Sequence, residues 1–199
     1  MKYNELISKL KGIENKKEQI EWLFQQLLTN CQYDYLYLEI EKIKRIAIQA
    51  DIDLNDLEVE ETREETLKTL AEKTSLSDDF VKYVRNREWE IRSQGEKDLQ
   101  FEQGILVKGV CNDYTNFINK VLTELGIESK RCVGKTPLNH AWNIISIENN
   151  PLHYDITYAM YARDKKIDKS NPTDWLGITT EQLQRLQPER TILSLTREK

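Results

Sequence analysis

The chain has 199 residues, a net charge of −5 and a pI near 5.3, and 39% of its residues are hydrophobic. This length is sufficient for one domain of ordinary size with its own core. The negative charge, without a dense stripe of lysine or arginine, argues against a nucleic-acid or anionic-membrane partner. No apolar run approaches the roughly 20 residues that span a bilayer, and the N-terminus lacks the apolar core of a secretion signal.

Cysteine usage favours a reducing compartment. The chain has three cysteines, Cys31, Cys111 and Cys132, which is an odd number without CxxC spacing. Such a set describes neither a disulfide framework nor a thiolate zinc site, and two histidines are too few to favour a zinc enzyme. We therefore expect a cytoplasmic protein without a metal or other cofactor.

Helical periodicity dominates the first half of the chain. Apolar residues at i, i+3, i+4, i+7 and i+8 predict a helix over Glu18–Thr29. Further helical patterns follow, with an acid-rich connection before the second of them and an N-cap cluster at Ser77–Asp79 before the third. These patterns cover Tyr35–Ile48, Glu61–Lys73 and Phe80–Arg92.

The second half of the chain predicts a helix followed by strands. An apolar stripe over residues 112–125 predicts the helix, and Gly126 is suited to its C-cap. The tail, Thr179–Leu195, predicts a short helix and a last strand. Three more strands are expected over Ile127–Gly134, His140–Ile147 and Leu152–Tyr158.

The connection between two of these strands decides their register. The turn lies either at Glu148-Asn149 or at Asn149-Asn150. No linker rich in glycine, proline or serine divides the chain, so we expect a single α+β domain over residues 1–199. Its helical portion extends to about residue 95, and its helix-plus-sheet core begins at about residue 96.

Three residues that can form a nucleophilic triad occur in order in this core. Cys111 precedes the predicted helix, His140 follows 29 residues later, and Asp155 stands 15 residues beyond it. At a helix N-terminus, free backbone amides and the helix dipole stabilise a thiolate, and the Cys111 amide can face a developing oxyanion. A two-residue turn at Glu148-Asn149 places His140 opposite Thr157, with Asp155 as its diagonal neighbour on the same face of the sheet. The three residues therefore suit a thiolate with its base and orienting carboxylate.

Each of the three residues also has a structural interpretation. A cysteine by itself is more often a buried inert thiol, and a histidine is as often a hydrogen-bonded core residue as a base. A carboxylate at a strand end is usually an ordinary polar residue. The triad is favoured because all three stand at the element positions that the chemistry requires.

Several stretches of the sequence carry a family resemblance: Glu18–Tyr35, which is a helix followed by Tyr33-Asp34-Tyr35, then Gly109–Tyr114, Leu125–Ile127 with Arg131–Gly134, His140–Asn143, and Tyr154–Thr157. Together they resemble the transglutaminase-like superfamily of papain-fold cysteine enzymes. The resemblance covers about residues 17–160. It implies a papain-like α+β fold in which the cysteine helix packs on a small antiparallel sheet. It also implies Cys111 as the nucleophile, His140 as the general base and acid, and Asp155 as the orienting carboxylate.

Two features depart from the pattern of that family. About seventy residues, rich in charge and in helix formers, separate the opening helix from Cys111. This enlarged helical segment could cover the site, bind a protein partner or only fill space. No side-chain oxyanion donor stands out among Gln94, Gln100 and Gln103. Trp142 either packs beside the site or contacts substrate together with Gln103.

These observations favour an enzyme whose cysteine attacks a carboxamide or peptide carbonyl and forms a thioester. Water would resolve the thioester in a protease or amidase, and an amine would resolve it in a transglutaminase. Hydrolysis is favoured because the sequence offers no identifiable site for an acceptor amine. The alternative is a catalytically silent interaction module that binds a protein through its helical segment.

Overall fold

The computed structural model describes residues 3–35, 107–136, 139–167 and 170–196, and five residues between 65 and 72. These belong to two compact units, one formed by Met1–Tyr33 with Asp98–Lys199 and the other by Asp34–Lys97. The first two helices of the chain therefore belong with the sheet, not with the charge-rich segment that follows them.

In the second unit, Glu65, Thr66, Lys68, Thr69 and Glu72 are helical. The hydroxyl of Thr69 donates to the carbonyl oxygen of Glu65 at 3.0 Å, which is a contact between successive turns of a helix. These residues agree with the helical pattern of the sequence at this position. The helices expected over Tyr35–Ile48 and Phe80–Arg92 lie outside the described residues, apart from the helical Tyr35.

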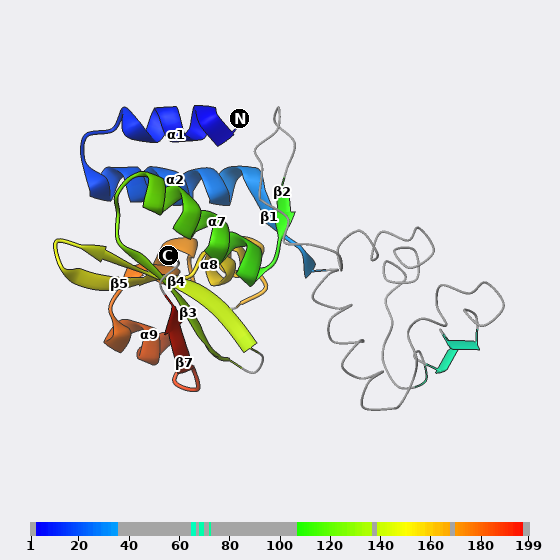
Figure 1. Ribbon diagram of the computed structural model, residues 1–199. Coiled ribbons are helices and arrows are strands. Elements are labelled where there is room, and N and C mark those ends of the chain that lie inside the picture. Colours follow the sequence, from blue (N-terminus) through cyan, green and yellow to red (C-terminus); the bar gives the residue numbers. More distant parts are fainter. Residues whose placement is uncertain are drawn as a thin grey trace. The chain divides into compact units, whose positions relative to one another are not determined.

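The first unit is a mixed α/β structure built on a five-stranded antiparallel sheet with the strand order β6-β5-β4-β3-β7 (Figure 1). A separate pair, β1 and β2, is parallel. The elements, in chain order, are α1 (Tyr3–Lys11), α2 (Lys16–Asn30), β1 (Cys31–Tyr33), β2 (Val107–Gly109), α7 (Cys111–Glu124), β3 (Ser129–Lys135), β4 (Asn139–Ile147), β5 (Asn150–Tyr154), α8 (Ile156–Arg163), the 3-10 helix η2 (Pro172–Trp175), β6 (Leu176–Ile178), α9 (Thr180–Leu186) and β7 (Thr191–Thr196).

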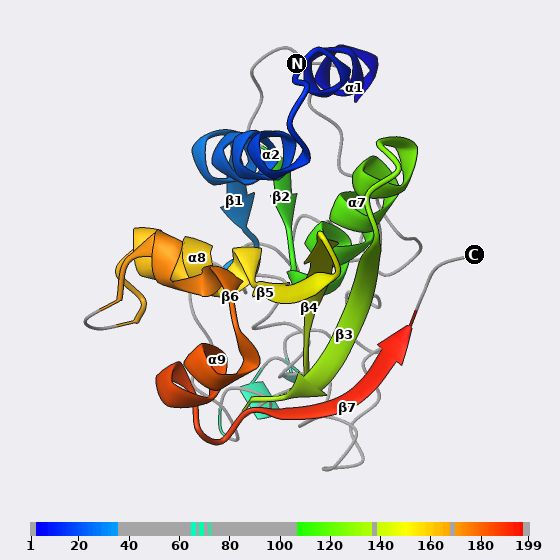
Figure 2. The ribbon, with the colours of Figure 1, turned by 90° about the vertical axis from the view of Figure 1, so that its left-hand side faces the viewer.

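The two faces of the sheet are covered by different helices. Asn143 of β4 bonds to α7, whereas its neighbour Trp142, on the opposite face, packs in a core cluster with Ala159 of α8 and Leu183 of α9. Figure 2 accordingly shows α7 on one side of the sheet and α8 and α9 on the other. The expected α+β organisation around an antiparallel sheet is confirmed.

The helix α7 ends at a glycine cap. Gly126 has a φ of 64°, in the left-handed region that favours glycine. Its N–H donates to the carbonyl of Thr123 at 3.1 Å, and the N–H of Ile127 donates to the carbonyl of Leu122 at 2.9 Å. These two bonds form a Schellman motif, so the predicted C-cap is confirmed.

The hairpin between β4 and β5 has a two-residue turn. Glu148 and Asn149 have φ values of 51° and 64°, as both central residues of a type I′ turn require. Ile147 therefore pairs with Asn150, which is the first of the two registers expected from the sequence. Continued to the open end of the hairpin, this register brings the segment after β5 next to His140.

The strand predicted over Leu152–Tyr158 is wrong in its second half. The strand β5 ends at Tyr154, Asp155 is the N-cap of α8, and its Oδ1 accepts from the N–H of Tyr158 at 3.0 Å. The alternation of apolar residues suits a strand, but Ile156, Ala159 and Met160 also form a helical i, i+3, i+4 stripe, and all three are buried. The helix is formed because Asp155 caps it and this stripe packs on the core.

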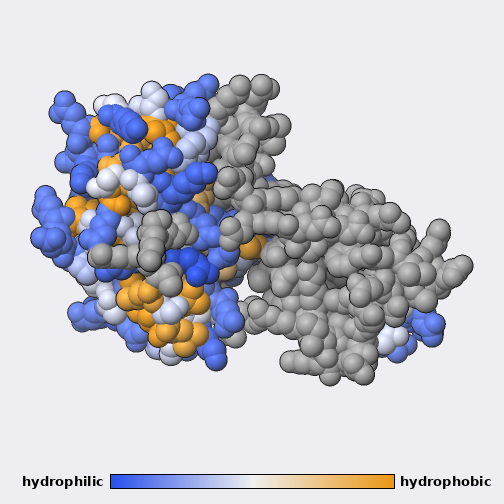
Figure 3. All heavy atoms as spheres, in the orientation of Figure 1, coloured by the Kyte–Doolittle hydropathy of each residue, from blue (hydrophilic) through white to orange (hydrophobic). Residues whose placement is uncertain are grey.

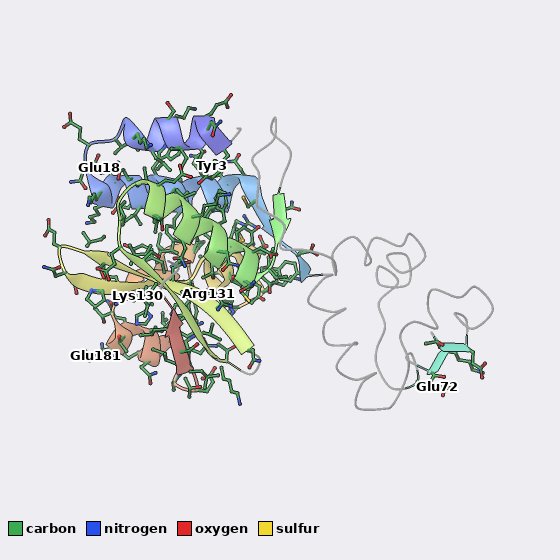
Figure 4. The ribbon with its side chains drawn as sticks, viewed as in Figure 1. Tyr3, Glu18, Glu72, Lys130, Arg131 and Glu181 are labelled. Carbon is green, nitrogen blue, oxygen red and sulfur yellow. The ribbon has the colours of Figure 1, made fainter. Side chains whose placement is uncertain are left out.

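Other elements of the first unit were not expected from the sequence. The helix α1 packs through Leu6, Ile7 and Leu10, and Tyr3, labelled in Figure 4, donates its hydroxyl to Glu124 Oε1 of α7 at 2.6 Å. The 3-10 helix η2 and the short strand β6 also lacked a clear periodic signal. Short elements give few repeats of any period, so their patterns are weak.

The surface near the last strand is apolar. Ile192, Leu193 and Leu195 of the edge strand β7 and Leu186 of α9 are exposed, and Figure 3 shows this hydrophobic surface in the region of β7 and α9. None of the helices in the described part of the chain is long and apolar enough to cross a membrane.

The buried stripe of α7 generates a stability prediction. Leu122 is fully buried, so Leu122→Ala is expected to lower the free energy of unfolding by about 2–4 kcal/mol, measured by urea denaturation. The control, Thr123→Ala on the exposed face of the same helix, is expected to change it by less than about 0.5 kcal/mol. Equal destabilisation by the two substitutions would contradict this packing.

Candidate active site

The parallel pair of strands fixes the backbone that leads into Cys111. Tyr33 of β1 pairs with Gly109 of β2, two residues before Cys111, which is the first residue of α7. The hydroxyl of Tyr114, one turn into α7, donates to the carbonyl of Gln32 at 2.6 Å. The start of the helix is therefore held at both its entering strand and its first turn.

The N-terminus of α7 lacks a side-chain cap. Val110 occupies the N-cap position, and it has no oxygen that could accept from the amides of the first turn. Asp113 accepts the N–H of Val110 at 2.9 Å, and Thr115 donates its hydroxyl to the carbonyl of Cys111 at 2.7 Å. These bonds order the first turn and leave the positive end of the helix dipole at the thiol.

Asp155 and Cys111 lie on opposite sides of the His140 ring. Nε2 of His140 lies 2.9 Å from Oδ2 of Asp155, and the thiol of Cys111 also hydrogen-bonds the ring. Because Nε2 contacts the carboxylate, Nδ1 is the nitrogen left for the sulfur. The half-buried Cys111 is the most exposed of the three, since His140 is 7% and Asp155 1% exposed.

The contact between Cys111 and His140 favours an ion pair of thiolate and imidazolium. Burial opposes it, but the hydrogen bond and charge of His140, with the backbone amide of Ala141, hold the pKa of Cys111 below its ordinary value. Burial also opposes the imidazolium, but the charge and hydrogen bond of Asp155, followed by Cys111, raise the pKa of His140 to about 9. Between these two pKa values, the site holds a thiolate beside a protonated histidine.

A buried polar cluster connects the nucleophile helix to the strand of His140. Nδ2 of Asn143, in β4, donates to Asn119 Oδ1 at 2.8 Å and to the carbonyl of Thr115 at 3.2 Å. Arg131 of β3, labelled in Figure 4, donates to Asn112 Oδ1 at 2.6 Å. Since hydrogen bonds are directional, the cluster fixes the position of α7 relative to the sheet. It thereby also fixes the distance from the Cys111 thiol to the His140 imidazole.

Trp142 lies behind the triad and packs against it. It is 1% exposed, its ring stacks on that of His140 with centroids 5.8 Å apart, and its Nε1 donates to Nδ1 of His153 at 2.9 Å. The indole presents almost no surface, which favours the packing role over substrate contact. Gln94, Gln100 and Gln103, the candidate oxyanion or substrate groups, lie outside the described residues.

His153 is a neutral structural residue. An indole N–H can only donate, so Nδ1 of His153 carries no proton, and Nε2 is then the donor to Thr180 Oγ1 at 3.0 Å. Burial, helped by the nearby charge of Arg190, lowers the pKa of His153 to about 4. The ring of His153 is therefore unsuited to act as a second base beside His140.

Sequence reasoning missed Arg190, which contacts the orienting carboxylate. Its Nη1 lies 2.7 Å from Oδ2 of Asp155, and the side chain is 1% exposed. The guanidinium carbon lies 4.6 Å from the ring centroid of Trp142 and 4.7 Å from that of Tyr158. One arginine among many charged residues, 35 positions after Asp155, gives no local signal in the sequence.

In the part of the chain that the structure describes, the other reactive groups do not form a second centre. Burial raises the pKa of Cys31 and of Cys132 to about 12, so both thiols stay protonated. Within the described ranges, no group of three or more His, Cys, Asp or Glu side chains is placed to hold a metal ion. A groove of about 700 Å³ lies between α2 and the β4–β5 hairpin, and the triad does not line it.

The ion pair predicts selective labelling of Cys111. At pH 6, iodoacetamide is expected to alkylate Cys111 well before Cys31 and Cys132, as read by peptide mass spectrometry. His140→Ala is expected to slow alkylation at least about tenfold, because the thiol loses the group that keeps its pKa low. An unchanged rate of Cys111 alkylation in His140→Ala would contradict the triad. Cys111→Ser is the control that assigns the labelled site.

His153 predicts a loss of stability in acid. Its folded-state pKa lies below its unfolded value, so its contribution is complete above pH 6.5 and is lost as the pH falls towards 4. The loss is on the order of 3 kcal/mol. In urea titrations from pH 7 to pH 4, His153→Gln is expected to be less stable at pH 7 but to show a shallower decline. If the wild type and His153→Gln lose the same free energy of unfolding as the pH falls, His153 is not a neutral buried ring.

No protein-family model matches the chain, and no curated protein matches it. The arrangement of Cys111, His140 and Asp155, with the groups that surround them, is therefore what indicates a function.

Proposed function

We propose that this protein is a cysteine-nucleophile enzyme of the transglutaminase-like, papain-fold type that cleaves an amide or peptide bond through a thioester. The observation that supports it best is the half-buried thiol at a helix N-terminus, hydrogen-bonded to an imidazole whose other nitrogen lies 2.9 Å from a buried carboxylate. These two contacts and the position at the helix N-terminus are what a cysteine hydrolase requires.

The reaction follows from the charges already present. The Cys111 thiolate attacks the carbonyl carbon, and the carbonyl oxygen becomes an oxyanion that the backbone N–H of Cys111 can stabilise at the positive end of α7. The carbon–nitrogen bond then breaks, and the imidazolium of His140 gives its proton to the departing amine. This leaves an acyl thioester and a neutral histidine.

Hydrolysis completes the cycle with the same groups. The neutral His140 takes a proton from water as the water attacks the thioester, and collapse of the second oxyanion releases the carboxylic acid and restores the thiolate. Asp155 keeps the ring oriented in both steps through its contact with Nε2. An amine in place of water would give transamidation, and the triad serves either acceptor.

The substrate class, the partner and the location are parts of the same proposal. The substrate is a protein, peptide or small amide, and the charge-rich second unit is a candidate surface for a protein partner. Three free cysteines suit a reducing, cytoplasmic environment.

A pooled peptide library analysed by mass spectrometry tests the activity. The wild-type protein is expected to cleave a subset of peptides and Cys111→Ala to cleave none. Added primary amine reports transamidation by the mass of the amide product. If Cys111 alkylates as an activated thiolate but the wild type and Cys111→Ala give the same products, the protein is a silent interaction module instead.

Turnover is also expected to depend on pH in a defined way. The rate should rise as Cys111 ionises and fall above about pH 9, where His140 loses the proton that the leaving amine needs. The profile of kcat/KM against pH for a cleaved peptide measures both limbs. An alkaline limb that remains flat to pH 10 would exclude His140 as the general acid.

A further inference from the structure

Arg190 is a buried cation in direct contact with the triad. Its side chain is 1% exposed, and its Nη1 lies 2.7 Å from Oδ2 of Asp155. The same oxygen lies 2.9 Å from Nε2 of His140, so two positively charged groups share one carboxylate oxygen. The other oxygen, Oδ1, accepts the N–H of Tyr158. Asp155 is therefore neutralised from two sides.

The surroundings of Arg190 hold the guanidinium in this position. Gln187 Oε1 accepts from its Nε at 2.7 Å, and Gln187 Nε2 donates to the hydroxyl of Tyr158 at 2.6 Å. The guanidinium lies against the rings of Trp142 and Tyr158, and that of Trp175 is 5.8 Å away. Stacking and planar hydrogen bonding suit arginine, whose charge is permanent, better than lysine.

In the proposed reaction, the charge of His140 changes twice in each cycle. When His140 is an imidazolium, it neutralises Asp155 by itself. When His140 has given up its proton, a carboxylate that is 1% exposed would be left without a counter-charge, and burial favours its protonation. A protonated Asp155 could not stabilise the imidazolium that must form next.

We propose that Arg190 is a positioning residue that keeps Asp155 ionised in both protonation states of His140 and thereby sets the pH range of the Cys111–His140 ion pair. The inference rests on the proposed function, since it assumes that His140 cycles its proton. It assigns to Arg190 no contact with substrate. The residue acts through Asp155, whose carboxylate it holds in place and keeps charged.

Other ionisable groups face this array from neighbouring elements. The charge of Arg190 lowers the pKa of His153 of β5 and opposes the rise in the pKa of Cys132 of β3, so both groups would titrate differently without the arginine. Stability alone would therefore not isolate the effect on the triad. Among the described residues, the ionisable groups that interact with Asp155, Arg190 or Cys111 include Tyr33 of β1, Cys132 of β3, His140 of β4, His153 of β5, and Tyr158 and Tyr161 of α8.

The sign of the effect follows from removing a buried positive charge. Such a loss favours the protonated form of every nearby acid, so the pKa of Asp155, of His140 and of Cys111 should all rise. The ion pair would then form at higher pH and persist to higher pH. A residue that only filled space would alter stability and leave these midpoints unchanged.

The test compares Arg190→Met, which keeps the bulk of the stem, with Arg190→Lys, which keeps the charge. Thiolate absorbance near 240 nm, corrected with Cys111→Ser, reports the midpoint of Cys111. The ring C–H resonances of the two histidines, distinguished with His153→Gln, report that of His140. In Arg190→Met both midpoints should move up by about one pH unit, and in Arg190→Lys they should stay close to the wild type.

Each outcome decides the proposal. Wild-type midpoints in a folded Arg190→Met protein, or equal shifts in both variants, would overturn it. If Arg190→Met does not fold, the double variant with Asp155→Asn is informative, because removing both charges should restore folding when the two are coupled. A double variant that also fails to fold would assign Arg190 to packing alone.

The same measurements separate this inference from the proposed function. If the wild-type Cys111 titrates like an ordinary thiol and His140 like an ordinary imidazole, the acyl-transfer proposal fails. The coupling between Arg190 and Asp155 is then read from urea midpoints of the two single variants and the double variant. If the double variant is more stable than either single variant, the result supports the proposal that Arg190 keeps Asp155 ionised. If the losses of stability in the single variants add up in the double variant, the result contradicts it.

Discussion

The buried carboxylate of Asp155 is the charge around which this site is arranged. Its two oxygens receive the imidazole of His140, the guanidinium of Arg190 and the backbone N–H of Tyr158. A carboxylate without such partners would be protonated at this depth, but these contacts hold its pKa well below the ordinary range despite burial. Because Asp155 also caps α8, the bond that starts a helix and the bond that orients the histidine come from one side chain.

The fold brings the thiol to this charge through two independent connections. The parallel pair β1–β2 ties the strand before Cys111 to the end of α2, and the buried amide of Asn143 ties α7 to the strand of His140. Neither connection includes a reacting atom. Both are directional contacts, and a shift along either would separate sulfur from imidazole. The N-terminal helices thus contribute to the site indirectly, as part of the unit that holds β1.

The segment after Tyr154 shows a limit of predicting secondary structure from the local sequence pattern. The order Leu152, Tyr154, Ile156 alternates as a strand does and predicts one, but the chain becomes helical after Asp155. The sequence signals of both structures are present, and a side chain with N-cap chemistry stands between them. The packing of Ala159 and Met160 on the core selects the helix. Asp155 consequently reaches His140 from a helix terminus, not from the diagonal of a strand pair.

The sequence by itself determined the elements with strong period or distinctive ends: α2, α7 with its Gly126 cap, the strands β3 and β4, and the order of Cys111, His140 and Asp155. Their signals are local, since they depend on residues within one or two turns of each other. Tertiary structure alone decided that Arg190 shares the carboxylate, that Trp142 is buried behind the ring and that His153 is neutral. Each of these depends on burial and on charges brought together from distant segments. Neither the burial of a residue nor the electric field around it is a property of a short stretch of chain.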